Sequence, residues 1–411
     1  MSTRTGARRI LVVGINYAPE SISTGKYTAE MCAWLSGRGH SVRVVTAPPY
    51  YPAWKVWPDY PRVWFKRHQL NGVDVIRCPL WVPENPSGIK RLLHLASFAL
   101  SSTFAVLASV AWRPSHVIVV APTLANAPSA WLAGRLAGAR CHLHIQDFEL
   151  DAALDMGIID AGPFKRLAAT LERWLLQAFD SVSTISPKMV ERLASKGVDE
   201  GRRLLFPNWA DIDSIRPLTE PSPYRKELAI PENAVVALYS GNMGLKQGLE
   251  LLGEAAERLR SRHDLFFVFG GQGPGRQHLE AQCGALPNVR FLDLQPSERL
   301  NEWLGLADIH LLPQRADVAD LVMPSKLTGM LASGRPVLAT ALPGTGVALA
   351  IEDCGRAVPP GDVDAFVHEL ECLASHRQLR EALGVAGRLR AQTSLAREAV
   401  LTRFEHSLQL T

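Results

Sequence analysis

Residues 10–15 read ILVVGI, a short run of apolar side chains that leads into a loop. A run this short and continuous predicts a strand buried on both faces, as in a parallel sheet. A helical pattern follows at Thr24–Arg38, and the next expected strand is Val42–Ala47. Strand, helix and strand in this order predict a doubly wound α/β fold.

The same alternation continues along the chain and then starts again. Strands are expected at 73–78, 117–122, 141–147 and 181–186, and in a second series at 235–240, 265–270, 289–292, 309–313 and 336–340. The proline-rich stretch Arg216–Pro223 separates the two series, so we place a domain boundary near residue 208. The last segment, Ser394–Leu410, is expected to form an amphipathic helix.

Composition and charge narrow the class of protein. The chain has 411 residues, 47% hydrophobic and 20% charged, which excludes a mostly disordered chain. Residues 1–113 hold 14 Lys and Arg but 5 Asp and Glu, whereas the remainder is mildly acidic. A one-sided basic surface suggests an anionic partner, such as a membrane face or a phosphate-bearing substrate; a merely solvated surface is the alternative. The six cysteines lack disulfide or zinc spacing, which favours a reducing compartment.

Two segments interrupt the alternation. Pro48–Arg67 is crowded with Trp, Tyr, Pro and basic residues and is not expected to form a regular helix or strand. Leu92–Trp112 has 21 residues without a charge, long enough to span a bilayer. Its polar stripe at His94, Ser97 and Ser101, and its place between two strands of one sheet, argue against spanning. A covering helix and a helix that partly faces lipid remain open.

Several loops after expected strands could hold an anion, because a helix start offers free N–H groups. The first domain has such a loop with Glu20, Gly25 and Lys26. The second domain has a similar loop, in which Lys246 follows Gly241 and Asn242. A third candidate helix start carries Ser325 and Lys326. Ordinary turns and solvated lysines are the alternatives.

The stretch Phe269–Gly275 resembles a dinucleotide fingerprint around Gly271. Asp293 follows about 20 residues later, where a ribose-binding acid would stand. However, Arg276 occupies the place of the third glycine. NAD binding is therefore a weaker interpretation of this loop than a site for another nucleotide.

A second candidate site lies at the end of the strand expected at 141–147. His142 and His144 alternate on one face of this strand, and Asp147 and Glu149 follow at its carboxyl end. Ligands of open α/β sheets bind at the carboxyl ends of strands. The two carboxylates are therefore better functional candidates than the histidines, and His142 is expected to pack against a helix.

Together these residues resemble the retaining glycosyltransferases of family 4, which have the two-domain GT-B fold. The resemblance covers nearly the whole chain. It is similar in particular to colanic-acid-type exopolysaccharide glycosyltransferases, in a branch associated with fucosyl transfer. The markers are Asn16–Glu20 with Gly25, Gly37–Val45, Ile185–Leu193, Pro207–Asp211, Lys246, Gly270–Gly273, Ala307–Pro313 and Pro324–Pro336.

The resemblance implies two Rossmann-like doubly wound domains that face a cleft. Residues 1–208 would bind the acceptor, with the helix in 392–411 packing back on them, and residues 209–391 would bind the donor. The donor would be a nucleoside diphosphate sugar, with GDP-fucose favoured and UDP-sugars as the alternative. The implied donor site is Gly241, Asn242, Lys246, Gly271, Asp293, Ser325 and Lys326.

The resemblance also implies partners and location. The acceptor would be a polyprenyl-diphosphate-linked saccharide at the cytoplasmic face of a bacterial inner membrane, with the enzyme bound peripherally to the anionic surface. No metal, other cofactor or nucleic acid is expected, because basic side chains and helix N-termini would neutralise the leaving diphosphate in this family.

The sequence departs from the family pattern at the catalytic positions. The usual pair of glutamates falls at Leu321 and Gly329, although Asp320 is adjacent to the first position. The catalytic candidates are therefore Asp320 together with Asp147 and Glu149. Elsewhere, the usual arginine before Lys246 is Asn242, and the usual histidine before Asp147 is Gln146. A nucleotide-sugar enzyme of another class, such as an epimerase, an NAD oxidoreductase, and a non-catalytic scaffold of this fold are the alternatives.

Overall fold

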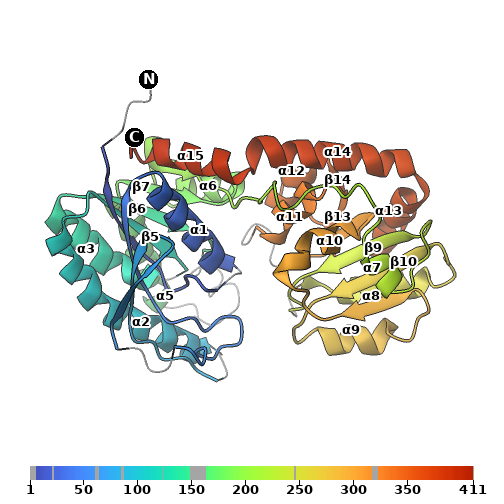
Figure 1. Cartoon of the computed structure of the whole chain (residues 1–411), viewed down its shortest axis with the longest axis horizontal. Helices are drawn as coiled ribbons and strands as arrows, with labels where there is room; N and C mark the ends of the chain where they lie inside the picture. The colour runs from blue at the N-terminus through green and yellow to red at the C-terminus, as the bar shows by residue number, and fades with distance from the viewer. Residues whose placement is uncertain are drawn as a thin grey trace. The chain divides into compact units, whose positions relative to one another are not determined.

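The computed structural model describes residues 6–20, 23–60, 64–84, 88–122, 124–148, 163–244, 247–316 and 323–410. The chain forms two compact units: unit 1 comprises residues 1–207 and 401–411, and unit 2 comprises residues 208–400. The division lies next to the predicted boundary at residue 208. Each unit is built on its own sheet (Figure 1). The acceptor- and donor-binding roles of the two units stay predictions.

Unit 1 is built on an eight-stranded sheet in the order β3-β4-β2-β1-β5-β6-β7-β8. All neighbours pair in parallel except β3 with β4, which are antiparallel. The central strands are continuous apolar runs and are buried, as the sequence predicts for a covered parallel sheet. The strands are β1 (Arg9–Val13), β2 (Ser41–Thr46), β3 (Lys66–Leu70), β4 (Val73–Arg77), β5 (His116–Ala121), β6 (Arg140–Ile145), β7 (Ser181–Thr184) and β8 (Arg203–Leu205).

The helices of unit 1 connect these strands. The chain moves one way along the sheet from β1 to β2 and the other way from β4 through β5 to β6. Right-handed crossovers therefore place α1 on one face, and α2 and α3 on the other (Figure 1). The helices are α1 (Ser23–Gly37), α2 (Gly88–Ala108) with the 3₁₀ turn η1 (Ser109–Trp112), η2 (Leu124–Asn126), α3 (Ala127–Ala137), α5 (Pro163–Ala178), α6 (Pro187–Ser195) and η3 (Glu200–Arg202).

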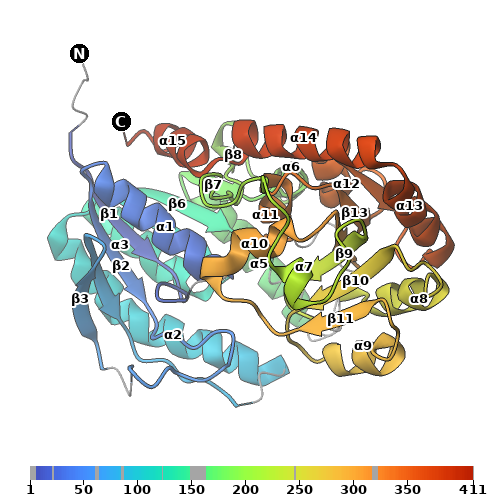
Figure 2. The same cartoon turned by 45° about the vertical axis from the view of Figure 1, so that its right-hand side comes forward.

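Unit 2 is built on a fully parallel six-stranded sheet in the order β11-β10-β9-β12-β13-β14. One apolar core lies between the sheet and α8, α9 and α13, and another lies against α11, α12 and α14 (Figure 2). The strands are β9 (Val235–Ser240), β10 (Leu265–Gly270), β11 (Val289–Leu292), β12 (Ile309–Leu312), β13 (Val337–Thr340) and β14 (Gly355–Val358).

The helices of unit 2 alternate with its strands. They are α7 (Tyr224–Glu227), α8 (Glu250–Arg258), α9 (Arg276–Cys283), η5 (Ser297–Arg299), α10 (Leu300–Gly305), α11 (Lys326–Ala332), α12 (Gly346–Ile351), α13 (Val363–Ser375) and α14 (Arg377–Ser394).

The C-terminal segment differs from the prediction at its beginning. Residues 392–394 belong to the long helix α14, and Leu395 packs on the core of unit 2. The final helix is α15 (Arg397–Ser407), and only residues from 401 onward group with unit 1. The prediction that residues 392–400 pack on the first domain is therefore wrong: these residues group with unit 2, where Leu395 packs on the core.

The end of α15 is an integral part of unit 1. The ring of Phe404 stacks on Phe206 with centroids 3.7 Å apart, and the centroid of the His142 ring lies 5.2 Å from that of Phe404 in an edge-to-face arrangement. The buried carboxylate of Glu405 accepts hydrogen bonds from Arg38 at 3.3 Å and from His40 Nε2 at 3.1 Å. His142 therefore packs against a helix, as predicted.

We expect Phe404→Ala to destabilise unit 1 by about 3–5 kcal/mol, because it opens a cavity beneath a stacked ring. Phe404 is 3% exposed. Denaturant dependence of hydrogen exchange in β5–β7 measures this loss. The matched control is Leu389→Ala on α14, where 59% exposure predicts a change within about 0.5 kcal/mol. Equal effects of the two substitutions would show that α15 does not support unit 1.

Candidate functional site

The carboxyl ends of β9 and β10 carry two glycine loops that lie directly against each other. Gly241 N donates to Gly270 O at 2.9 Å, and Met243 N donates to the carbonyl of Gln272 at 2.9 Å. Gly271 has a φ of +146°, and a Cβ there would stand 1.8 Å from the carbonyl oxygen of Gly241. The backbone approach thus requires glycine at 271, and it leaves a surface without side chains where ligands of such sheets bind.

Lys326 brings a buried cation to these loops. Its Nζ is buried without a hydrogen-bond partner and lies 4.1 Å from the centroid of the Tyr239 ring. The same atom is 3.8 Å from the Cβ position of Gly241. Burial lowers the pKa of Lys326 to about 7. Because an unpaired buried amine is costly, this geometry favours an anionic ligand beside the glycine loops.

The other predicted donor residues are placed differently. Asn242 is exposed in the first glycine loop, and its carbonyl accepts the Tyr239 hydroxyl at 2.6 Å. Ser325 precedes α11, is exposed and makes no side-chain capping bond. The carboxylate of Asp293 is 73% exposed and pairs with Arg276 through one oxygen, and its contact with a ribose stays a prediction. Lys246 lies outside the described residues.

Sequence reasoning missed two residues that shape this site. Tyr239, the next-to-last residue of β9, supplies the ring beneath Lys326; as part of a buried apolar strand it gave no functional signal. Arg276 donates to Gly271 O at 2.9 Å and pairs with Glu280 at 2.8 Å. The residue that breaks the dinucleotide fingerprint therefore holds the second glycine loop in place.

The first-domain loop predicted to bind an anion is filled by a carboxylate. Glu20 is 3% exposed and accepts the backbone N–H groups of Tyr50 at 2.8 Å and Tyr51 at 2.9 Å. A Cβ on Gly25 would stand 3.1 Å from the Glu20 side chain, while Lys26 pairs with Glu30 at 3.9 Å. The structure thus uses Glu20 and Gly25 to tie two loops together. The cation at this loop is the buried Arg77, which donates to the Ala18 carbonyl; burial raises the pKa of Glu20, and the charge of Arg77 opposes that shift.

The carboxyl end of β6 carries the carboxylate candidate of unit 1. Part of the Asp147 side chain reaches the surface, but protein atoms surround most of it. This burial raises the pKa of Asp147 to about 6, and the charge of Arg91 opposes the shift. His144 bonds to Ser183 at 2.8 Å, and burial lowers its pKa to about 3, so it stays neutral. Glu149 lies outside the described residues.

Of the other positions that the sequence links to catalysis, the structure describes only Gly329. Asp320 and Leu321 lie outside the described residues. Gly329 lies in α11, where an added Cβ would stand 3.3 Å from Leu304 and 3.6 Å from Ile215. An apolar environment thus surrounds the position where the family's second glutamate would stand. Within the described ranges, no group of three His, Cys, Asp or Glu side chains could hold a metal ion.

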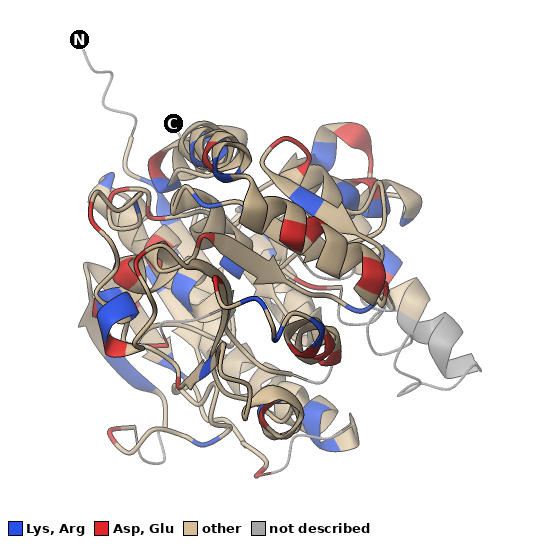
Figure 3. Ribbon diagram, turned by 90° about the vertical axis from the view of Figure 1, so that its right-hand side faces the viewer, with Lys and Arg blue, Asp and Glu red and all other residues tan. Residues whose placement is uncertain are grey.

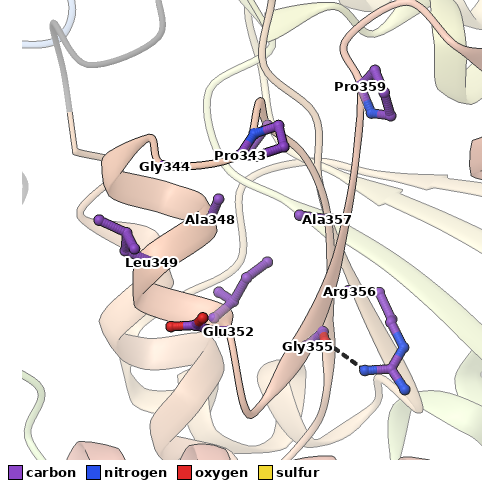
Figure 4. Close-up of a pocket in the computed structure, with 11 residues that line it drawn as sticks. Pro343, Gly344, Ala348, Leu349, Glu352, Gly355, Arg356, Ala357 and Pro359 are labelled. Atoms are coloured by element: carbon purple, nitrogen blue, oxygen red, sulfur yellow. Dashed lines mark hydrogen bonds between the residues drawn. The ribbon is translucent and has the colours of Figure 1, made fainter.

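A shallow pocket of about 340 Å³ opens between α12 and β14 (Figure 4). Its lining is mostly Ala, Pro, Gly and Leu, with Glu352 and Arg356 as its charged members. The Arg356 guanidinium donates to the carbonyl of Gly355 at 3.2 Å and pairs with Glu369 at 3.7 Å. The pocket includes none of the predicted site residues, and its one arginine is already paired, so it is not the candidate site.

Two doubly wound parallel-sheet units, the second with glycine loops beside a buried lysine, define the architecture of a GT-B glycosyltransferase. Residues 24–209 match the model of the glycosyl transferase 4-like domain, and residues 222–390 match that of glycosyl transferases group 1. The chain belongs to this family and is a glycosyltransferase.

A known relative matches nearly the full length of the chain. The chain is 42% identical over 416 aligned residues, 98% of this chain and 100% of the other, to WcaI of Escherichia coli K12, a glycosyl transferase named for colanic acid biosynthesis. Solved structures share its fold. Sucrose-phosphate synthase from Thermosynechococcus elongatus has a TM-score of 0.73 at 17% identity, covering 98% of both chains. Anabaena HepE, bound to UDP and glucose, has a TM-score of 0.69 at 13% identity, covering 98% of this chain and 100% of that one.

We expect Gly271→Ala to destabilise unit 2 by more than about 3 kcal/mol, because the methyl group would overlap the Gly241 carbonyl. The control is Gly361→Ala, which has a φ of +82° but no atom within 4 Å of the added Cβ. That substitution should cost only the left-handed backbone strain, about 1–2 kcal/mol. Denaturant unfolding compares the two variants, and equal losses would contradict the close approach.

Proposed function

We propose that this glycosyltransferase moves a sugar from a nucleoside diphosphate sugar to a saccharide acceptor in exopolysaccharide biosynthesis, with retention of anomeric configuration. The observation that carries the donor assignment is the buried, unpartnered Nζ of Lys326 beside the glycine loop at Gly241. Its full-length similarity to WcaI supports the exopolysaccharide assignment. GDP-fucose is the favoured donor, and UDP-sugars are the alternative.

Lys326 would stabilise the leaving diphosphate. The developing negative charge of the phosphate oxygens would meet a cation in a site from which the protein excludes much of the water, where electrostatic stabilisation is strong. The bare backbone at Gly241 and Gly271 would let the diphosphate approach the loops closely. With charge supplied by a side chain, we propose that transfer needs no metal ion.

Asp147 is our candidate for the carboxylate that assists the acceptor. Its pKa, raised to about 6 by burial, leaves it ionised at neutral pH but close to the range useful for proton transfer. We propose that the acceptor is a polyprenyl-diphosphate-linked saccharide, so that the reaction takes place at the cytoplasmic face of a bacterial inner membrane, with the enzyme bound peripherally.

Transfer of radiolabelled sugar from GDP- or UDP-sugars into the lipid fraction of native membranes tests the proposal. We expect transfer with one of these donors. The anomeric configuration of the new linkage should be the same as that of the sugar in the donor. No transfer from any of these donors by well-folded protein would count decisively against the proposed reaction. A product of inverted anomeric configuration would contradict retention but not the sugar transfer itself.

We expect the affinity for a nucleoside diphosphate sugar to fall by up to tenfold per pH unit above about pH 7. Below its pKa of about 7 the Lys326 amine already carries a proton, whereas above it the binding of phosphate must take up one. Titration calorimetry with UDP-glucose or GDP-fucose, whose phosphates do not titrate in this range, measures the slope. Lys326→Met should bind roughly tenfold to a hundredfold more weakly near pH 7 and lose the slope. The matched control Lys226→Met, at an exposed position, should keep both. A flat wild-type profile would contradict a role for the lysine.

We expect Asp147→Asn to reduce turnover at least tenfold while donor affinity changes little, because it removes a charge from the acceptor side. The wild-type rate should fall as the pH drops below about 6, as the carboxylate becomes protonated, and the variant should lack this acid limb. Steady-state rates at several pH values provide the measurement. Unchanged turnover would remove Asp147 from the catalytic residues.

A further inference from the structure

Helix α2 is inverted relative to an ordinary surface helix: its polar stripe faces the protein. His94 is fully buried, and its Nδ1 lies 2.7 Å from the carbonyl oxygen of Trp81. Ser97 accepts the Trp81 N–H at 3.1 Å, and Ser101 donates to Pro79 O at 2.6 Å. The backbone of the segment before α2 thus forms hydrogen bonds with all three side chains of the polar stripe.

The opposite side of α2 exposes large apolar side chains. Ile89 is 73% exposed, Leu100 is 72% exposed and Phe104 is 71% exposed, with Leu93 at 54% between them. Steps of four, seven and four residues place all of these side chains on one side of the helix. The described helix is long and apolar enough to cross a membrane, yet only 28% of its most apolar window is buried. Its most hydrophobic stripe is therefore the one that meets solvent.

The exposed apolar surface continues onto the neighbouring helices. Helix α3 packs against both α2 and α5, and the rings of Trp131 and Trp174 meet with centroids 5.6 Å apart. We call the exposed hydrophobic side chains of α2, α3 and α5 the apolar face. Its principal members are Leu93, Leu100, Phe104, Leu132, Leu136 and Trp174.

The charges on this surface have one sign. Among the described side chains of α2, α3 and α5, the exposed charges are all basic: Lys90, Arg91, Arg135 and Arg173. The one acid, Glu172, is buried and pairs with Lys196 at 2.6 Å. Elsewhere Lys and Arg are interspersed with Asp and Glu along the ribbon (Figure 3). Exposed leucine and aromatic side chains among exclusively basic residues match an anionic lipid surface.

We infer that the apolar face of unit 1 docks on an anionic lipid bilayer, with α2 lying in the interface plane. The helix does not span, because its two ends join β4 and β5, which belong to one sheet. A lipid surface fits better than a soluble partner, since it can cover an apolar strip along a whole helix and pair with basic side chains only. The inference deepens the proposed reaction at a membrane, but its evidence is the structure of unit 1 alone.

Vesicle sedimentation tests the apolar part of this inference. We expect the full chain to pellet with vesicles of phosphatidylglycerol and phosphatidylcholine, and Leu100→Ser/Phe104→Ser to weaken partitioning at least tenfold. The matched control is Val385→Ser/Leu389→Ser on α14 of unit 2, whose side chains are 69% and 59% exposed. This control should pellet like the wild type. Equal pelleting of both double variants would overturn the inference.

A second pair of variants tests the charge. Lys90→Gln/Arg135→Gln should weaken partitioning about tenfold or more at low salt, since each basic residue near an anionic surface contributes severalfold. Lys226→Gln/Arg260→Gln removes the same charge from exposed positions of unit 2 and should have little effect. The wild type should leave the vesicles in high salt or mild detergent. Indifference to anionic lipid, or a requirement for full bilayer solubilisation, would overturn the inference.

Two further readouts separate this inference from its competitors. Light scattering reports self-association: if Leu100→Ser/Phe104→Ser dissociates an oligomer and leaves vesicle binding intact, a second copy covers the apolar face and the inference fails. Thermal shift with GDP and UDP reports the donor site in unit 2 separately. Loss of vesicle binding with an intact nucleotide shift therefore supports the docking surface, whereas absence of a nucleotide shift with intact docking would count only against the proposed reaction.

Discussion

The close approach of Gly271 to the carbonyl of Gly241 is the constraint on which the candidate donor site depends. With a Cβ position only 1.8 Å from that oxygen, the two loops can meet only where no side chain exists. Their contact joins the ends of β9 and β10 and leaves bare backbone beside Lys326. Arg276 reinforces the arrangement through its bond to the Gly271 carbonyl. With side chains in place of these glycines, the two loops could not meet, and the bare backbone beside Lys326 would be lost.

The corresponding loop of unit 1 has the opposite electrostatic character. Both loops follow the first strand of their sheet and are rich in small residues, yet Glu20 occupies the first one with a buried carboxylate. That carboxylate accepts two consecutive backbone N–H groups, at Tyr50 and Tyr51, which an anionic ligand would otherwise compete for. The protein's own carboxylate thus occupies this loop, beside the buried Arg77 that donates to the Ala18 carbonyl, whereas the amine of Lys326 in unit 2 has no such partner.

Arg91 links the two features of unit 1 that matter for the proposed reaction. It stands in the first turn of α2, beside the apolar face, and its charge opposes the effect of burial on the pKa of Asp147. A phosphate-rich surface that drew Arg91 away would weaken that opposition. In the proposed reaction, lipid contact would therefore affect the ionisation of Asp147 through this one side chain.

The sequence by itself determined the succession of most strands and helices along each domain and the place of the loops between them. Strands β9 and β10 begin and end at the predicted residues, because continuous apolar runs suit strands covered on both faces. The edge strand β11 also has the predicted bounds, although its segment VRFL is only partly buried. The edge strands β3, β8 and β14 were not predicted, since their segments KRHQL, RLL and GRAV hold no such run. The prediction that Pro48–Arg67 contains no strand fails at its last two residues, which begin β3.

Only the tertiary structure decided which way certain side chains face. Periodicity shows a polar stripe and an apolar stripe on α2, but the stripe that turns inward depends on acceptors supplied by another segment, the carbonyls of Pro79 and Trp81. The sequence likewise could not show that Lys326 would be buried over Tyr239, or that Glu20 would be consumed by the backbone of Tyr50 and Tyr51. Local patterns specify the elements; the partners that bury or expose a charge come from residues brought together by the fold.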